Sequence, residues 1–206
     1  MQRTRREILN ILKKKGKATL EELAAGVGLV PVTVRAHLNV LERDDFVRYE
    51  EVRGKVGRPF YVYSLTEEAE SLFPKTYHVL ANRVIEGVAT AFGEEGIERL
   101  AEAISDTWVK EKAPRLQGKS GIKLIEEVAN IRAEEGTWAE VEKQSDGTVD
   151  IVQYNCPCPQ VSNRHSEVTC AAELLYMRSM LGPNVERIEW VQNGSRVCRF
   201  RVPVGQ

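Results

Sequence analysis

The sequence predicts an α+β fold with three parts, and the spacing of its apolar residues supports each of them. Residues 1–66 show helical spacing followed by two strand-like runs, and residues 67–136 keep helical spacing throughout. Residues 137–206 predict the order β-β-α-β-β, which suits a small antiparallel sheet with a helix on one face. A length of 206 residues allows one large domain or two small ones.

The composition is ordinary for a soluble protein, with 42% hydrophobic and 29% charged residues. Its apolar stretches are far shorter than the roughly 20 residues that span a bilayer. The first ten residues, MQRTRREILN, lack the apolar core of a signal peptide. We therefore expect a cytoplasmic protein without membrane contact, in which clustered cysteines more often bind metal or do redox chemistry than form disulfides.

The net charge of −1 conceals an uneven distribution. Residues 1–64 contain 13 Lys and Arg and 8 Asp and Glu, a net charge of +5, which leaves −6 for residues 65–206. A basic N-terminal third suggests a module that binds a polyanion.

Two helices are predicted at the start of the chain. The first covers residues 5–16 and has an apolar stripe made of Ile8, Leu9, Ile11 and Leu12. The second starts after Thr19, which forms a capping box with Glu22. Gly26 and Gly28 then indicate a tight turn.

A third helix follows this turn, with Pro31 at its first position. Val34, Leu38 and Leu41 recur at helical spacing, so this side should face the core. The opposite side carries Val32, Arg35, Ala36, Asn39 and Arg43, flanked by Thr33. Two helices joined by a short glycine turn predict a helix-turn-helix, whose second helix enters the major groove of DNA. Arg and Asn are the side chains that read guanine and adenine edges.

A basic hairpin follows the third helix. Residues 46–53 and 60–65 are rich in Val, Phe and Tyr, and the turn at 54–59 contains Gly and Pro. The cations at this turn are Arg53, Lys55 and Arg58. A hairpin with a basic tip directly after a recognition helix predicts a wing that contacts phosphate or the minor groove. The alternative is a small α/β core with a solvated charged hairpin.

The helices of residues 67–136 are expected to link and pair subunits. One of them has a regular apolar stripe made of Tyr77, Leu80, Val84, Val88 and Phe92. Because a dimer reads two half-sites, a homodimer would gain affinity and specificity for its double-stranded DNA operator. The alternative is that these helices pack only within one chain. His78 is interpreted as a surface or packing histidine.

All four cysteines lie in the C-terminal part, at residues 137–206. Cys156 and Cys158 lie in the loop after the second strand, Cys170 is early on the helix, and Cys198 is on the last strand. No CxxC pair is present, so the common zinc signatures fit poorly. Thiolates favour zinc, copper(I) or iron–sulfur clusters. A thiol redox switch and burial as small apolar residues are the alternatives.

Two segments of the N-terminal part resemble known repressors. TVRAHLNVLERDDFV, at residues 33–47, is similar to the recognition helix of ArsR- and MarR-type winged-helix repressors. GRPFYVYSLTEEAESLFP, at residues 57–74, resembles the wing and linker of a narrower group, the SUF-operon iron–sulfur (SufR-like) repressors. One departure is Val30, which stands before Pro31 where Ser or Thr is common as the helix cap.

The C-terminal part resembles the same repressors through NCP at 155–157, EVTCAAELLYMRSMLG at 167–182 and VERIEWVQNGSRVCRFRV at 185–202. The resemblance implies an iron–sulfur cluster bound by the metal ligands Cys156, Cys170 and Cys198, with [4Fe–4S] favoured and [2Fe–2S] as the alternative. The choice between Cys156 and Cys158 stays open, because the first interval is one residue longer than in the family. Cys158 is the candidate for the fourth ligand, and His165 is the runner-up.

We therefore expect a DNA-binding transcriptional regulator, a repressor by resemblance, whose affinity for DNA depends on the cluster. The competing interpretation is a winged-helix regulator in which the cysteines bind structural zinc or act as a redox switch, or which senses a small ligand. An enzyme is not expected, because the sequence has no GxGxxG motif and no P-loop, and its histidines are scattered at His37, His78 and His165.

Overall fold

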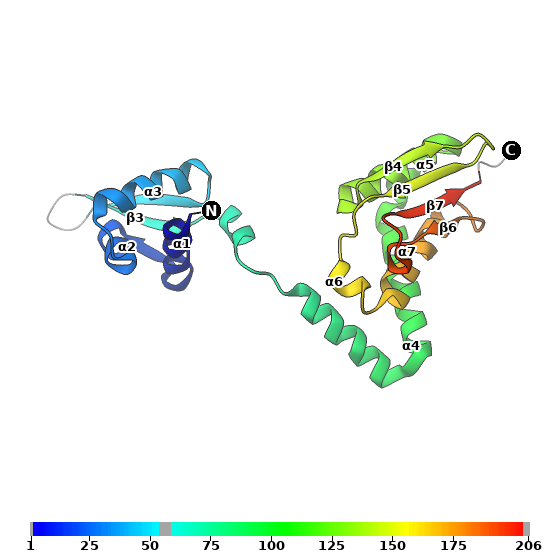
Figure 1. Ribbon diagram of the computed structural model, residues 1–206, viewed down its shortest axis with the longest axis horizontal. Coiled ribbons are helices and arrows are strands. Elements are labelled where there is room, and N and C mark those ends of the chain that lie inside the picture. Colours follow the sequence, from blue (N-terminus) through cyan, green and yellow to red (C-terminus); the bar gives the residue numbers. More distant parts are fainter. Residues whose placement is uncertain (1, 54–58, 204–206) are drawn as a thin grey trace. The chain divides into compact units, whose positions relative to one another are not determined.

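The computed structural model describes residues 2–53 and 59–203, and these divide into two compact units. The first unit is Met1–Lys75 and the second is Thr76–Gln206 (Figure 1). The expected α+β architecture is confirmed, with helices and an antiparallel sheet in each unit.

The N-terminal unit packs three helices against a three-stranded antiparallel sheet. The helices are α1 (Arg3–Lys15), α2 (Leu20–Val27) and α3 (Pro31–Arg43). The strands are β1 (Lys17–Thr19), β2 (Val47–Val52) and β3 (Phe60–Leu65), in the order β1-β3-β2. A 3₁₀ turn, η1 (Glu68–Leu72), follows the sheet. The sequence does not predict strand β1, because this strand has only three residues and its partner β3 lies more than 40 residues along the chain.

The core of this unit is built by the stripes that the helical spacing predicts. Each of the three helices buries its apolar side, and the residues with at most 1% exposure are Ile8, Leu9, Leu12, Leu23, Val34, Leu38 and Leu41. Burying a side chain of this size stabilises the folded state by roughly 1.5–3 kcal/mol. This core fixes the rotation of α3 about its axis, and therefore fixes which of its residues face away.

The ends of α2 are set by local chemistry. The Thr19 hydroxyl accepts a hydrogen bond from the Glu22 backbone N–H at 3.2 Å, and Glu22 accepts one from the Thr19 N–H at 2.8 Å. These bonds confirm the capping box. Gly28 ends the helix with φ 69°, a conformation that favours glycine. Gly26 differs from expectation: it lies inside α2, where a Cβ atom would come within 2.7 Å of Ile11 Cδ1.

The N-terminal unit extends past the boundary at residue 66 that the sequence suggested. Leu72 and Phe73 pack on its core, and Arg6 Nη1 donates a hydrogen bond of 2.7 Å to the Leu72 carbonyl. The cations of Arg6 and Lys13 also lie 5.8 and 5.0 Å from the centre of the Phe73 ring. The boundary moves to Lys75 because this segment folds back onto α1.

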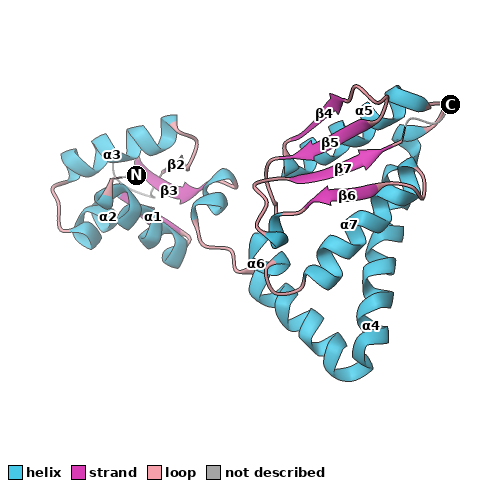
Figure 2. Ribbon diagram, turned by 45° about the vertical axis from the view of Figure 1, so that its right-hand side comes forward, coloured by secondary structure: helices cyan, strands magenta, loops and turns pink. Residues whose placement is uncertain are grey.

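The C-terminal unit contains a four-stranded antiparallel sheet and a layer of helices (Figure 2). Its strands are β4 (Ala139–Lys143), β5 (Val149–Gln153), β6 (Glu186–Glu189) and β7 (Cys198–Val202), in the order β4-β5-β7-β6. Its helical segments are α4 (Tyr77–Leu116), α5 (Gly121–Arg132), the π-turn η2 (Ala133–Thr137), α6 (Pro159–Ser162), α7 (Ser166–Leu181) and the 3₁₀ turn η3 (Val191–Asn193). The predicted order β-β-α-β-β is confirmed, with the short α6 added before α7.

The central helices do not form a separate layer between two domains. Ile125, Val128 and Ile131 of α5 share one core with Ile151 and Phe200 of the sheet, and α4 packs along α7. The expected division at residue 136 is therefore absent from the structure, because the apolar stripe of α5 covers the sheet. Helix α4 is interrupted at Gly93, which has φ 66° and ψ −157°.

Within residues 2–53 and 59–203, no single helix is long and apolar enough to cross a membrane. Only α2 and α3 taken together reach that length and composition, and they are bent by 106°. Both helices bury their apolar sides in the N-terminal core.

The carboxylate of Asp150 joins strands β5 and β7. Asp150 is 1% exposed, and its carboxylate accepts hydrogen bonds from Arg201 Nε at 3.0 Å and Nη2 at 3.1 Å. Arg199 Nη1 lies 3.3 Å away and also contacts Glu142, while its Nε contacts Glu189. One buried carboxylate thus holds together two arginines, and Arg199 also binds the two edge strands.

We predict that Asp150→Asn destabilises the C-terminal unit by about 2 kcal/mol, because it removes charge-assisted hydrogen bonds to two arginines. Urea unfolding followed by circular dichroism measures the change. Glu126→Gln, at an exposed position on α5, is the control and should unfold like the wild type. Equal stability of both variants and the wild type would contradict the role assigned to Asp150.

Candidate functional site

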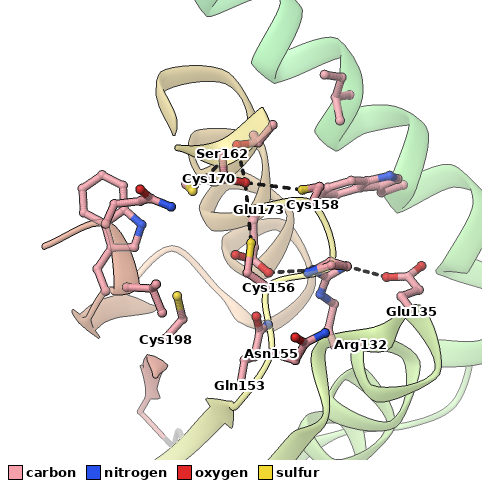
Figure 3. Close-up of a pocket in the computed structure, with 17 residues that line it drawn as sticks. Arg132, Glu135, Gln153, Asn155, Cys156, Cys158, Ser162, Cys170, Glu173 and Cys198 are labelled. Atoms are coloured by element: carbon pink, nitrogen blue, oxygen red, sulfur yellow. Dashed lines mark hydrogen bonds and ion pairs between the residues drawn. The ribbon is translucent and has the colours of Figure 1, made fainter. Parts of the chain in front are cut away.

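The four cysteines line one cavity of about 280 Å³ in the C-terminal unit (Figure 3). Cys156 and Cys158 come from the loop after β5, Cys170 from the first half of α7, and Cys198 from the start of β7. The structure thus brings together residues separated by up to 42 positions in the sequence. All four thiols are free, with Cys170 buried and the others half-buried.

Two hydroxyl groups connect three of the thiols. The Cys158 sulfur lies 3.3 Å from Ser162 Oγ, and the Cys156 thiol donates to the same oxygen at 3.7 Å. Thr169 Oγ1 donates to Ser162 Oγ at 3.1 Å and lies 3.8 Å from the Cys170 sulfur. Ser162 is 2% exposed, so this network fixes residues 154–158, the cysteine loop, against the start of α7.

Cys198 occupies a different wall of the cavity. It lies directly opposite Gln153 in the antiparallel pairing of β5 and β7, so both side chains point to the same face of the sheet. Farther along β7, Phe200 and Val202 continue this face into the core. The backbone N–H of Val191 contributes a hydrogen bond to the Cys198 sulfur that favours the thiolate.

Burial is the main influence on two of the thiols. It raises the pKa of Cys158 and the pKa of Cys198, because a thiolate is poorly solvated there. The hydrogen bond from Ser162 partly opposes the rise at Cys158, as the Val191 N–H does at Cys198. A bound metal cation reverses this balance, since coordination deprotonates a thiol.

A buried ion pair forms the next wall of the cavity. Arg132 is 5% exposed, and its guanidinium donates to Glu173 at 2.6 Å and also to Glu135. The guanidinium carbon lies 5.4 Å from the centre of the Trp108 ring and 6.0 Å from that of Tyr176. Burial opposes the charge of Arg132, but the two carboxylates outweigh it and raise the pKa of the guanidinium. Arg132 thus keeps its positive charge beside the thiols.

The thiols surround the cavity and do not meet at one point. Among the described residues, no three His, Cys, Asp or Glu side chains converge closely enough to hold a single metal ion. His165, the runner-up ligand, is outside the cavity lining. Its Nδ1 lies 3.3 Å from Glu167 and its Nε2 lies 3.9 Å from Glu86. The structure therefore groups the four cysteines and places His165 elsewhere.

The sequence does not single out the polar residues around the thiols. Ser162, Thr169, Arg132 and Glu173 carry no motif that distinguishes them from ordinary surface residues. The i, i+3 spacing of Cys170 and Glu173 is a sequence signal that could have placed both side chains on one face of α7. The contribution of Arg132 depends on the packing of α5, which the spacing of apolar residues does not specify.

The second candidate surface is the outer side of α3 in the N-terminal unit. Val32, Arg35, Ala36, Asn39 and Arg43 are all exposed, and Thr33 is half-buried beside them. Val34, Leu38 and Leu41 are at most 1% exposed on the other side. Arg43 contacts the neighbouring Asp44 at 3.1 Å. The orientation that the sequence predicts for α3 is confirmed, and its contacts with bases stay a prediction.

The β2–β3 hairpin after α3 is the candidate wing. Strands β2 and β3 pair in antiparallel register from Val47 with Leu65 to Val52 with Phe60. Arg53 is exposed at its end, with Nε 3.6 Å from a Glu51 oxygen. The other two wing cations, Lys55 and Arg58, lie outside the described residues.

A family model described as a winged helix-turn-helix DNA-binding domain matches residues 1–48. No curated protein matches the chain. The Z-DNA-bound Zalpha domain of PKZ from Carassius auratus is 28% identical, over 31% of this chain and 92% of its own, with a TM-score of 0.25. A transcriptional regulator homologue from Pyrococcus horikoshii is 26% identical over 40% and 80%, with a TM-score of 0.31. The adhesin competence repressor of Streptococcus pyogenes is 22% identical over 57% and 84%, with a TM-score of 0.32. The family match over residues 1–48, together with helices α1–α3 and the β2–β3 pair, shows that the N-terminal unit contains a winged helix-turn-helix DNA-binding domain.

We predict that Arg35→Ala weakens specific DNA binding by about 1–3 kcal/mol, because it removes an exposed cation from the recognition side of α3. Fluorescence anisotropy on a fragment selected by the wild type from a random pool measures the loss. Lys14→Ala, at an exposed position on α1, is the control and should bind as the wild type does. Equal losses for both variants on every DNA sequence would indicate a purely electrostatic contribution.

Proposed function

We propose that the protein is a transcriptional regulator whose affinity for DNA is controlled by an iron–sulfur cluster bound by Cys156, Cys158, Cys170 and Cys198. The single observation that carries this proposal is the presence of all four thiols around one cavity, on a chain with a DNA-binding domain. The resemblance to SUF-operon repressors favours repression over activation.

The set of donors fits a cluster better than a single ion. Zinc needs its ligands converging on one point at about 2.0–2.3 Å. The four cysteines instead surround about 280 Å³, and no three metal-binding side chains of the described residues converge on one ion. A cluster of several iron atoms can join thiolates that stand on different walls. Of the two cluster types, [4Fe–4S] uses four cysteines as [2Fe–2S] does, and the resemblance favours the former.

When bound, such a cluster supplies a redox-sensitive crosslink between thiolates. The residues of the chain that respond to it are those of the cysteine loop. Directly after Cys158, α6 packs on the first half of α4: Val161 contacts Ile85, and Asn82 Nδ2 donates to the Gln160 carbonyl at 3.3 Å. Order in the cysteine loop is therefore coupled to the helix that follows the DNA-binding domain in the chain.

Control of DNA binding then follows from a shift in population. A group that binds only the ordered loop stabilises the conformation of α4 that goes with this order. Loss of the bound group leaves α6 held by the Val161 contact, the Asn82 hydrogen bond and the ion pair between Arg164 and Glu86 at 2.6 Å. We propose that the DNA-binding form is the one with the ordered loop.

The competing functions use the same thiols. Structural zinc would give a colourless protein, and a thiol redox switch would give a protein without metal whose DNA affinity responds to oxidants. A regulator that senses a small ligand would leave the cysteines as core residues. Metal and sulfide content distinguishes these possibilities from the proposed cluster.

We predict that anaerobically purified protein contains iron and acid-labile sulfide, and that Cys170→Ser loses most of both, because the variant removes a thiolate from α7. Ultraviolet–visible and Mössbauer spectra measure the cluster, and anisotropy measures DNA affinity with and without iron. Ser145→Ala, in the exposed turn between β4 and β5, is the control. A colourless protein with stoichiometric zinc, or an unaltered cluster in Cys170→Ser, would exclude the proposal.

We also propose that the protein acts as a homodimer paired through the first half of α4. On this segment Tyr77, Leu80 and Val84 are 72%, 63% and 53% exposed, at helical spacing. Asn82 and Ile85 are buried on the opposite side, against the cysteine loop. The exposed stripe is thus directed away from the chain's own core. A second copy is the partner that such a self-complementary stripe fits, since a two-fold axis places the same residues opposite each other.

We predict that Leu80→Glu converts the dimer to a monomer, because it places a charge in the apolar stripe. Sedimentation velocity measures the mass, and anisotropy on DNA with two half-sites should show weaker binding. Ala89→Glu is the control, since it adds the same charge at an exposed site half a helical turn around from Leu80. A wild-type protein that sediments as a monomer, or a dimeric Leu80→Glu, would refute pairing through this stripe.

A further inference from the structure

Three buried N–H groups in the wall of the cysteine cavity have no acceptor within residues 2–53 and 59–203. They are Arg132 Nε, Gln153 Nε2 and Trp190 Nε1, and all three residues line the cavity. Arg132 and Gln153 are 5% and 4% exposed. Because a buried donor without an acceptor destabilises a fold, such groups are uncommon and indicate a missing partner. Their convergence on one cavity points to a single acceptor-rich group inside it.

Gln153 is placed by the sheet. Its backbone ends β5 and pairs with Cys198 at the start of β7, so the amide and the thiol are cross-strand neighbours on one face. The donor at Nε2 thus stands beside the one cysteine that the Ser162 hydroxyl network does not reach.

Trp190 is placed by a half-buried cation. It directly follows β6, and the guanidinium carbon of Arg187 lies 4.9 Å from the centre of its ring. Arg187 also donates to the Cys170 carbonyl on α7. The indole therefore lies beside a cation of β6 that also binds the helix carrying Cys170.

Other amides in the same wall are satisfied within the protein. Asn155 Nδ2 donates to the Gly136 carbonyl at 2.6 Å, and Gln192 Nε2 donates to Asn163 Oδ1 at 3.2 Å. The lack of an acceptor is therefore specific to Arg132, Gln153 and Trp190 and is not a general property of this wall.

We propose that these three N–H groups donate hydrogen bonds to the sulfur atoms of the group that the cysteines bind, and that they set its reduction potential. The inference rests on the proposed iron–sulfur function, and it assigns to the three residues a role that the cysteines do not have. Hydrogen bonds to cluster sulfurs favour the reduced, more negative state, so they raise the potential. Gln153 and Trp190 would contact the bound group through these hydrogen bonds alone, since neither supplies a ligand to iron.

The test is an anaerobic redox titration of the full chain, followed by absorbance and electron paramagnetic resonance. Gln153→Leu and Trp190→Phe each remove one donor and keep an apolar side chain of similar size. Both should bind iron and sulfide in the wild-type amount and have a more negative reduction potential. Gln192→Leu is the matched control, because it also alters the cavity wall but removes an amide that already donates to Asn163.

The outcomes separate this inference from the function on which it rests. A wild type without iron and sulfide overturns both. A wild type with a cluster, whose potential is the same in Gln153→Leu, Trp190→Phe and Gln192→Leu, overturns the inference alone and leaves the cluster proposal standing. If Gln153→Leu fails to fold, Trp190→Phe decides the question, since its ring keeps the contact with Arg187.

Discussion

The burial of α7 between α4 and the C-terminal sheet is the constraint on which the cysteine cavity depends. Tyr176 and Met177 are at most 1% exposed, and the Tyr176 ring packs edge-on against Trp108 of α4, with centres 5.9 Å apart. This packing fixes both the rotation and the axial position of the helix. Glu173 and Cys170, about one and two turns earlier, are thereby directed into the cavity. Without this burial, the loop, helix and strand cysteines would have no common site.

The buried ion pair of Arg132 links this packing to the site. Arg132 closes the end of α5 and binds Glu173 of α7, while the rings of Trp108 and Tyr176 lie near its guanidinium. A buried pair of this kind adds little net stability, since desolvation opposes attraction, but removing one partner is costly. Its contribution is therefore to fix the geometry of α5 and α7, and to keep charge beside the thiols.

The regulation proposed for this protein depends on the packing of α6 against α4. Val161, Ile85 and Val168 form a small apolar cluster of their own, to which Cys158 also contributes. The same helix segment that receives α6 on one side exposes Tyr77, Leu80 and Val84 on the other. Under the proposed function, a change of order in the cysteine loop would pass through this helix to the stripe proposed to pair with a second subunit. The proposed regulation thus requires only the contacts between α6 and the first half of α4.

The elements that depend on neighbouring residues could be predicted from the sequence. The N-terminal fold and the outward side of α3 follow from apolar spacing on α1 and α3, from the capping box at Thr19 and from the hairpin signals. Each of these signals lies within a short stretch of sequence. Tertiary structure alone decided the rest. Strand β1, the end of the first unit at Lys75, the shared core of α5 and the sheet, and the exclusion of His165 from the cavity all depend on contacts between distant segments. The same holds for Ser162, Arg132 and Gln153, whose polar groups acquire a role only where packing removes them from water beside the thiols.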